Sequence, residues 1–359
     1  MRKILLLMLA VIAGYLFFWP VPIAPVAWQT PTAPALEGPY ERNDRLNRFR
    51  SLGQNQGSGP EDVAIDDRGR LYVGYEDGRV VRFRPDGNAP ELLADTGGRP
   101  LGLDFAPDGH LIVADGYRGL LSIDEGGAVT VLSRSAGGVP FGFTDDVDVA
   151  RDGRIYFSDA SSKFGPAMKA RDDIMEHGGH GRLLRYDPAS GATEVLLDGL
   201  QFANGVALSR DEDFVLVNET GSYRITRYWL KGAKAGTHDL FFDNLPGFPD
   251  GISANGHGTF WLALYSPRNA LLDAMSDKPL LRKMAFRLPE LLQPRPAHHA
   301  FVLGLDENAA VIHNLQGTGP GAFAPITSAE QHGDTLYLGS LTETRFAAYS
   351  LADAARTPR

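Results

Sequence analysis

Short runs of branched and aromatic residues recur along most of the chain, and each is bounded by turn-forming residues. Residues 71–75 and 155–159 are examples whose composition favours β-strands. The turns DRGR, PDGH, RDGR and GHGT place Gly between two such runs, as tight antiparallel connections require. Six units of roughly forty residues can be aligned on these turns. A repeat of that length with four short strands indicates an all-β, six-bladed β-propeller.

The sixth unit ends near Leu351 and lacks an outermost strand. Residues 46–52, just before the first unit, can supply that strand. Pairing the two ends of the chain would close the ring and leave no open sheet edge. We therefore assign residues 46–359 to the propeller.

Two segments interrupt the repeat. Residues 163–181 in the third unit are polar, and we interpret their two histidines, His177 and His180, as loop polarity rather than a metal pair. Residues 267–294 in the fifth unit place Leu and Met at helical spacing with Arg and Lys between them, which predicts a helical insertion in blade five. Such an insertion could cap a pocket or rest on a membrane surface, or it could simply pack on the propeller face.

The N-terminus has a different pattern. Arg2 and Lys3 precede an uncharged stretch at residues 4–19, and the apolar character continues to residue 28. We predict a signal-anchor or transmembrane helix within residues 1–28, with the propeller on the extracytoplasmic side. A cleaved signal peptide, which would leave the protein secreted, is the alternative. A buried first helix is disfavoured because the segment has no polar face.

Proline recurs between residues 20 and 39, so residues 29–45 are expected to form a stiff linker. The rest of the composition is that of an ordinary globular protein, with 43% hydrophobic and 22% charged residues. The net charge of −9 and the lack of long basic runs exclude nucleic acid as an expected partner. The absence of cysteine excludes disulfides and thiolate chemistry. Nucleophile-elbow, Walker and Rossmann motifs are also absent from the sequence.

One position of the repeat is occupied mostly by side chains with oxygen donors. In four of the six units, the residue eight positions before the turn is an oxygen donor, namely Glu61, Asp145, Asn204 and Asp250. In the other two units it is Leu101 or Ile326. Because equivalent inner-strand residues of a propeller face one axis, these four side chains should gather at one point. Three carboxylates at one point cannot all stay ionised unless something neutralises them, and the choices are a cation, shared protons or a geometry in which solvent separates them.

An all-oxygen donor set favours Ca²⁺ over zinc or copper, although another divalent cation would also fit. The alternative is that the four residues only cap the inner strands. A second acidic set ends the second strand of three units, at Asp115, Asp159 and Glu219. These carboxylates could surround the metal, or they could hydrogen-bond to neighbouring loop amides. His313 follows a predicted strand at residues 310–312, so it could overhang the pocket or lie on the surface.

Several longer segments carry a family resemblance that extends over residues 59–351. They include GPEDVAID, LIVADGYRGLL, DGRIYFSDASSKF, FANGVALSRDEDFVLVNET and DNLPGFPDGIS. The chain resembles the strictosidine-synthase-like branch of six-bladed propellers, whose wider superfamily also holds gluconolactonases and paraoxonases. Its N-terminal anchor resembles that of a membrane-associated member of this branch.

The resemblance implies a central calcium ion held by Glu61, Asn204 and Asp250, and hydrolysis of esters or lactones. Family members usually have Asn at the position of Asp145, and the substitution keeps an oxygen donor but adds a charge. The catalytic His of paraoxonases would fall near Leu101, and the catalytic Glu of strictosidine synthases near Thr327. Neither of those two mechanisms is therefore implied for this chain.

Two functions are compatible with these patterns. In the first, the chain is a calcium-dependent hydrolase of small carboxylic esters or lactones, with Asp250 as a metal ligand and as general base toward a water molecule. In the second, it is a non-catalytic, membrane-tethered binding propeller in which calcium is structural. The hydrolase is our main prediction.

Overall fold

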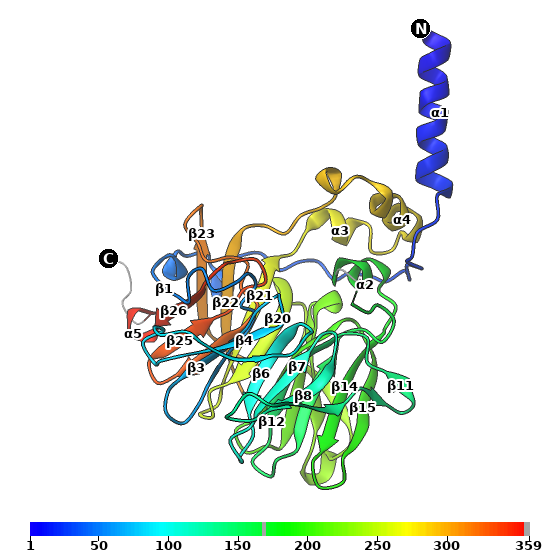
Figure 1. Ribbon diagram of the computed structural model, residues 1–359. Coiled ribbons are helices and arrows are strands. Elements are labelled where there is room, and N and C mark those ends of the chain that lie inside the picture. The colour runs from blue at the N-terminus through cyan, green and yellow to red at the C-terminus, as the bar shows by residue number, and fades with distance from the viewer. Residues whose placement is uncertain (167–169, 355–359) are drawn as a thin grey trace.

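Six four-stranded antiparallel sheets form the body of the protein (Figure 1). The computed structural model describes residues 1–166 and 170–354. The innermost strands of successive blades contact one another in order around a central channel, which confirms the predicted six-bladed β-propeller. The end of the predicted propeller at residue 359 and part of the 163–181 insertion lie outside the described residues.

Each blade runs from its innermost to its outermost strand. Blade one contains β2 (Val63–Ile65), β3 (Leu71–Gly74), β4 (Arg79–Phe83) and β5 (Glu91–Asp95), and blade two contains β6 (Pro100–Phe105), β7 (Leu111–Asp115), β8 (Gly119–Ile123) and β9 (Val129–Ser133). Blade three contains β12 (Thr144–Val149), β13 (Ile155–Asp159), β14 (Gly181–Asp187) and β15 (Ala192–Leu200), and blade four contains β16 (Ala203–Leu208), β17 (Phe214–Glu219), β18 (Arg224–Trp229) and β19 (His238–Phe242). Blade five contains β20 (Gly247–Ala254), β21 (Thr259–Pro267), β22 (His299–Asp306) and β23 (Val311–Thr318).

Blade six is built from both ends of the chain. Its inner strands are β24 (Ala329–His332), β25 (Thr335–Leu338) and β26 (Phe346–Ser350), and its outermost strand is β1 (Arg50–Leu52). β1 pairs with β26 in antiparallel register, so that Arg50 lies opposite Ala348. The predicted closure of the ring by the N-terminal segment is therefore confirmed. A small hairpin, β10 (Ser135–Ala136) with β11 (Val139–Pro140), stands outside the blades.

The hydrophobic core is divided among the blade interfaces. Six clusters of buried apolar residues each combine side chains from two neighbouring blades. In one of them Val113 and Leu121 of blade two meet Val80 of blade one, and all three are fully buried. Because neighbouring blades cover both faces of each sheet, many strands consist of nearly continuous runs of hydrophobic residues.

The innermost strands are irregular near their starts. The pairing register shifts between Thr144 and Val147 in β12, between Ala203 and Val206 in β16, and between Pro249 and Ile252 in β20. Such a β-bulge adds a residue to one strand and redirects the side chains at that point. In these three strands the bulge contains the residue that the sequence register had picked out.

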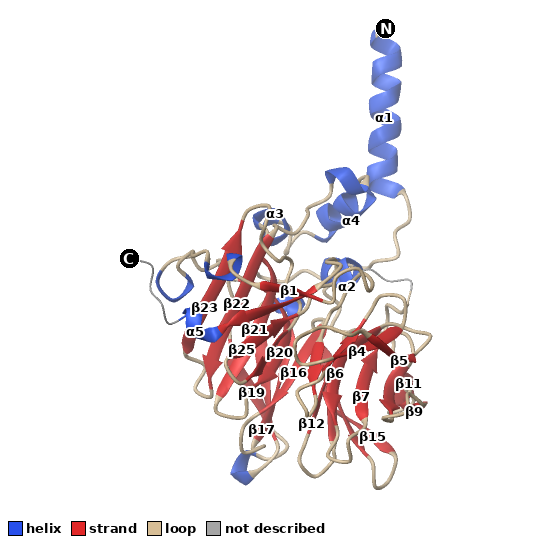
Figure 2. Cartoon of the chain, turned by 60° about the vertical axis from the view of Figure 1, so that its left-hand side comes forward, coloured by secondary structure: helices blue, strands red, loops and turns tan. Residues whose placement is uncertain are grey.

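Short helices cover one face of the propeller, the face from which the N-terminal helix projects (Figure 2). They are α2 (Ala170–Glu176), α3 (Ala270–Ala274) and α4 (Pro279–Arg287), and together we call them the lid. The predicted helical insertion at residues 267–294 is thus two helices and the short η5 (Glu290–Leu292) rather than one continuous helix. Pro279 begins α4, a position where the missing N–H of proline costs nothing.

The remaining short elements connect or flank the blades. They are η1 (Gly38–Tyr40), η2 (Arg45–Asn47), η3 (Thr220–Ser222), η4 (Gly232–Lys234) and α5 (Leu351–Ala354).

The proline-rich segment at residues 20–36, which we call the strap, is bound to the lid. Ile23 is 3% exposed and packs with Met175, Met275 and Ala285 of the lid. The backbone N–H of Ala24 donates to Oε2 of Glu176 at 2.7 Å. Residues 23 and 24 belong to the segment 1–28 that was predicted as an anchor. Within the predicted linker at residues 29–45, the carbonyl oxygens of Pro31 and Thr32 accept hydrogen bonds from Arg268 and Asn244, so this part of the linker is also bound to the propeller body.

The predicted N-terminal helix is present as α1 (Arg2–Phe18), which has 17 residues, none of them buried. It extends away from the propeller (Figure 1). In the described ranges, no helix combines the length and the apolar character that crossing a membrane requires.

Candidate metal centre

The four residues selected by the sequence register lie together at one end of the central channel. We call Glu61, Asp145, Asn204 and Asp250 the upper ring. Their exposed fractions are only 8%, 4%, 6% and 5%, respectively. Three of them line a cavity of about 170 Å³ in the channel. The fourth, Asp250, accepts a hydrogen bond through Oδ1 from Nδ2 of Asn204 at 2.6 Å.

The carboxyl groups of the upper ring shift one another's pKa values. Burial raises the pKa of Asp145 well above its usual value, and the charges of Glu61 and Asp250 raise it further. The pKa of Asp250 is raised by burial and by Glu61, while the hydrogen bond from Asn204 opposes the rise. Burial raises the pKa of Glu61 to about 7, and the nearby Arg99 guanidinium opposes that rise.

The upper ring has the donor chemistry that a hard divalent cation needs. Three carboxylates and one amide supply only oxygen donors, and Oε2 of Glu61 is buried without a hydrogen-bond partner. In the described part of the chain, no group of three or more His, Cys, Asp or Glu side chains is arranged so that it could hold a metal ion. The upper ring therefore fits a divalent cation in the chemistry of its donors, and its side chains would have to move closer together to coordinate one.

The backbone of the upper ring is held by neighbouring blades. Thr327 of blade six donates through Oγ1 to the carbonyl oxygen of Glu61 at 2.8 Å. Asn218 donates through Nδ2 to the carbonyl oxygen of Asp250 at 2.5 Å. Sequence reasoning missed both supports, because nothing local in the sequence shows which loop a side chain on another blade will reach.

A second group of carboxylates lies further along the channel, and we call it the lower ring. Each member accepts a backbone N–H from the next blade: Asp62 from Leu103 at 2.9 Å, Asp104 from Val149 at 2.7 Å, Asp146 from Val206 at 2.8 Å and Asp148 from Leu208 at 2.7 Å. Burial is the largest cause that raises the pKa of each of them, to about 6 for Asp148. For Asp62, Asp146 and Asp148 the signal in the sequence was the further acids that follow the register position in EDVAID and DDVDVA, whereas Asp104 follows an apolar register position and had no such signal.

The predicted second acidic set is engaged in the loops. Oδ1 of Asp115 accepts the backbone N–H groups of Arg99, Tyr117 and Arg118. Asp159 is fully buried and pairs with Arg182 at 2.6 Å.

Glu219 likewise pairs with Arg224 at 2.7 Å. Asp159 also accepts the backbone N–H groups of Gly142 and Phe143, and Glu219 accepts that of Gln201, so all three acids bind loop amides as the alternative considered above expected. His313 lies within β23, the outermost strand of blade five, and stacks on Trp261, so the structure does not bring it to the upper ring.

The lid and the upper ring lie on the same face. α2 packs against η3, which directly follows Glu219, and Glu219 is paired with Ala203 at the start of β16. Arg282 of α4 fastens the lid because its guanidinium donates to the carbonyl oxygens of Met175, Ser276 and Val26.

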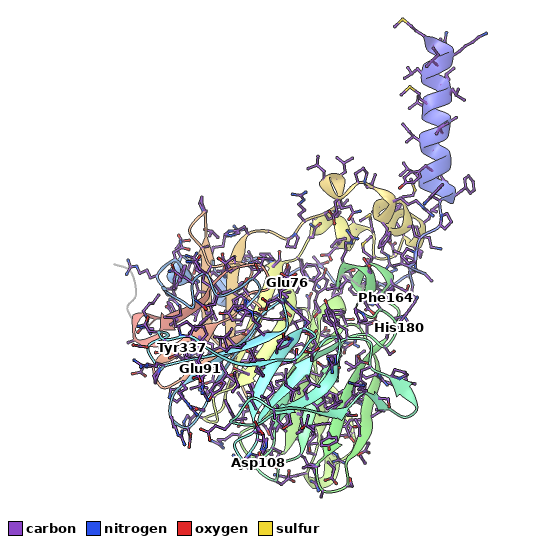
Figure 3. The ribbon with its side chains drawn as sticks, in the orientation of Figure 1. Glu76, Glu91, Asp108, Phe164, His180 and Tyr337 are labelled. Carbon is purple, nitrogen blue, oxygen red and sulfur yellow. The ribbon has the colours of Figure 1, made fainter. Side chains whose placement is uncertain are left out.

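Near the edge of the lid, the rings of His180 and Phe164 lie edge to face at 6.1 Å (Figure 3). His180 Nε2 also contacts Glu176 at 2.8 Å. His177 instead stacks on Trp28 of the strap. The structure thus places neither predicted loop histidine in the upper ring.

Comparison with solved structures defines the class of fold. The chain aligns with a gluconolactonase from Xanthomonas campestris with a TM-score of 0.61 and 19% identity, covering 92% of this chain and 99% of that one. It also aligns with regucalcin, a calcium-binding protein from Agrobacterium tumefaciens, with a TM-score of 0.58 and 13% identity, covering 84% and 93% of the two chains. At these identities the likeness establishes a gluconolactonase-like propeller fold and nothing further.

Sequence comparison defines the family. Residues 145–233 match the strictosidine synthase model, and residues 38–83 match the N-terminal model of strictosidine synthase-like proteins. Adipocyte plasma membrane-associated protein from Rattus norvegicus is 35% identical, over 93% of this chain and 96% of that protein. Strictosidine synthase-like protein 10 from Arabidopsis thaliana is 37% identical, over 82% of this chain and 86% of that protein. The chain belongs to the strictosidine synthase-like family, which confirms the resemblance seen in its motifs.

Proposed function

We propose that the protein is a calcium-dependent hydrolase of small carboxylic esters or lactones, with its active centre at the upper ring. The observation that carries the proposal is the group of three buried carboxylates and one amide around the channel, with Oε2 of Glu61 unpartnered. The fold shared with a gluconolactonase and with a calcium-binding protein supports the same reading.

In this proposal Glu61, Asp145, Asn204 and Asp250 would hold the ion. When bound, the ion would supply a Lewis acid that polarises the carbonyl group of the substrate. Asp250 would accept a proton from the attacking water while the water oxygen adds to the carbonyl carbon. Asp250 would then return that proton to the departing alkoxide, so that the products are the alcohol and the carboxylic acid. The hydrogen bond from Asn204 orients the Asp250 carboxylate for this role.

Restricted access to the upper ring favours a small or flexible substrate. The upper ring is nearly inaccessible to solvent. The lid lies on the same face, where Arg282 fastens α4 to α2 and to the strap. A substrate would therefore enter only when the lid moves or through the narrow channel. The same burial favours the second candidate, a non-catalytic binding propeller in which calcium is structural.

The test uses the full-length protein in detergent, with aryl acetates and lactones as substrates. We expect turnover to stop in chelator and to return with Ca²⁺. Asn204→Ala should raise the Ca²⁺ concentration needed for half-maximal turnover by roughly 10- to 100-fold, because it removes a donor and the partner of Asp250. Asn308→Ala, on an exposed turn of blade five, is the matched control and should behave like the wild type.

Two results would contradict the hydrolase. Turnover that survives chelator would separate the activity from the upper ring. A protein that is stabilised by Ca²⁺ but hydrolyses no substrate in the panel would instead support the binding propeller.

We also propose that α1 attaches the protein to a membrane, with the propeller on the extracytoplasmic side. Its apolar side chains are broadly exposed, for example Leu7 at 66% and Val11 at 64%. Flotation with phosphatidylcholine vesicles tests this, and loss of flotation is expected for a Leu7→Asp, Val11→Asp variant.

A further inference from the structure

Arg99 lies beside the upper ring, outside the residues that the sequence register selected. It directly precedes β6, and its backbone N–H donates to Oδ1 of Asp115 at 2.9 Å. Arg99 is only 5% exposed, so a full positive charge is held inside the protein. A buried charge is costly unless an opposite charge compensates it.

The guanidinium group of Arg99 has unused hydrogen-bonding capacity. Within the described residues, Nη1 is buried and has no hydrogen-bond partner. Arg182, by contrast, is committed to a direct ion pair with Asp159 at 2.6 Å. The positive charge of Arg99 also acts on the upper ring, because it is the largest influence that lowers the pKa of Glu61.

Close packing against Gly59 fixes this position. Gly59 has a φ of +64°, and a Cβ there would lie 2.7 Å from Nη2 of Arg99 and 2.8 Å from the carbonyl oxygen of Leu341. No side chain fits at either distance. The loop that leads into Glu61 therefore lies directly on the guanidinium group.

The net charge of the upper ring explains why a positively charged side chain would be buried beside it. Glu61, Asp145 and Asp250 carry a formal charge of −3 when ionised, and a bound divalent cation would leave −1. One further positive charge brings the total to zero. We propose that Arg99 is the internal counter-ion of the upper ring, which offsets the third carboxylate and sets how tightly the site holds a divalent cation. This inference rests on the proposed metal site.

Two opposite effects follow. Without metal, Arg99 reduces the repulsion among the three carboxylates and stabilises the fold. With metal, the same positive charge repels the cation and weakens its binding. Asp145→Asn should act in the same direction as the charge of Arg99, and opposite to Arg99→Gln, because it keeps an oxygen donor and removes one negative charge.

The experiment is a double-mutant cycle on the full-length protein, with Ca²⁺ affinity measured by calorimetry and thermal unfolding measured in chelator. We expect Arg99→Gln to bind Ca²⁺ roughly tenfold more tightly and to unfold at a lower temperature in chelator than the wild type. Asp145→Asn should bind Ca²⁺ roughly tenfold more weakly. The double variant should return close to the wild-type dissociation constant.

The matched control is Arg118→Gln, from the loop after β7, where Nη1 donates to the carbonyl oxygen of Thr96 at 2.9 Å. It should leave the dissociation constant unchanged. If Arg99→Gln fails to fold, Arg99→Lys keeps the charge and should retain the wild-type affinity.

The possible outcomes distinguish a failure of this inference from a failure of the proposed metal site. If Arg99→Gln loses the same stability with and without Ca²⁺, and Asp145→Asn does not compensate, then Arg99 only packs and the inference is wrong. A changed Ca²⁺ affinity in Arg99→Lys would also contradict it. If the wild-type protein binds no divalent cation at all, the proposed metal site fails first.

Discussion

The upper and lower rings share one channel but differ in what their carboxylates bind. In blade one, Asp62 accepts the backbone N–H of Leu103, while its neighbour Glu61 leaves Oε2 unpartnered. In blade three, Asp146 accepts the N–H of Val206, whereas the surroundings of Asp145 are dominated by other acids. A buried carboxylate saturated by backbone amides fastens two blades together. One whose neighbours are acids is available to a ligand.

In blade three, a β-bulge places one carboxylate of each ring at adjacent positions of the same strand. In a regular strand, consecutive side chains point to opposite faces. Asp145 and Asp146 lie in the register shift of β12, and both line the channel cavity. The bulge therefore allows one strand to supply a fastener and a candidate ligand from adjacent positions.

The largest expected effect concerns the proposed catalytic role of the upper ring. Asp250→Asn removes the proposed general base but keeps an oxygen and the partner of Asn204. Turnover should fall by about 100-fold or more, with the unfolding temperature in chelator unchanged or raised. Steady-state kinetics with saturating Ca²⁺ and thermal unfolding measure the two quantities. A variant that retains near-wild-type kcat would remove Asp250 from the chemistry.

The next effect tests the lower ring as a fastener. Asp146→Ala deprives two backbone amides, those of Val147 and Val206, of their acceptor. The free energy of unfolding should fall by about 3 kcal/mol, with or without Ca²⁺. Asp145→Ala is the adjacent control and should instead stabilise the protein in chelator, because it relieves repulsion in the upper ring. Equal losses in both variants, measured by chemical denaturation, would contradict the division between the rings.

The smallest effect is a dependence of stability on pH that belongs to the upper ring. Because the folded pKa of Glu61 is raised to about 7, this group favours folding most below its ordinary pKa near 4.5. Its contribution is lost as the pH rises from there through 7. The metal-free protein should lose roughly 2 kcal/mol over this range, less than the full shift gives, because neighbouring acids titrate with it.

Denaturation curves at several pH values in chelator measure this loss. Glu61→Gln should reduce the dependence, and so should saturating Ca²⁺ in the wild type. The part that comes from the lower-ring carboxyl groups, whose pKa values burial also raises, should remain in both cases. A dependence that is equally steep in Glu61→Gln would assign it to other carboxyl groups.

Much of the architecture could be predicted from local pattern alone. Turn glycines and strand composition predicted the six blades, and the position eight residues before each turn predicted which residues share the upper ring. The closure by β1 followed from counting strands in the last unit. Each of these features depends on a short stretch of sequence and on the symmetry of the repeat.

The features that could not be predicted depend on contacts between distant segments. Arg282 reaches carbonyl groups in α2 and in the strap, 256 residues away at Val26. Arg99 matters because the loop of another blade lies on it. The engagement of Asp115 by the amide of Arg99 likewise requires knowing where two loops meet.

The position of β1 has a mechanical consequence. This strand of three residues holds the ring shut, and it is the first blade strand reached by any force applied to the chain from its N-terminal helix. Between the two lies the strap, bound to the lid through Ala24 and Val26. A pull on α1 would load those contacts before it reached the seam between β1 and β26. The strap would thus take up the load first and protect the pairing of β1 with β26, on which closure of the ring depends.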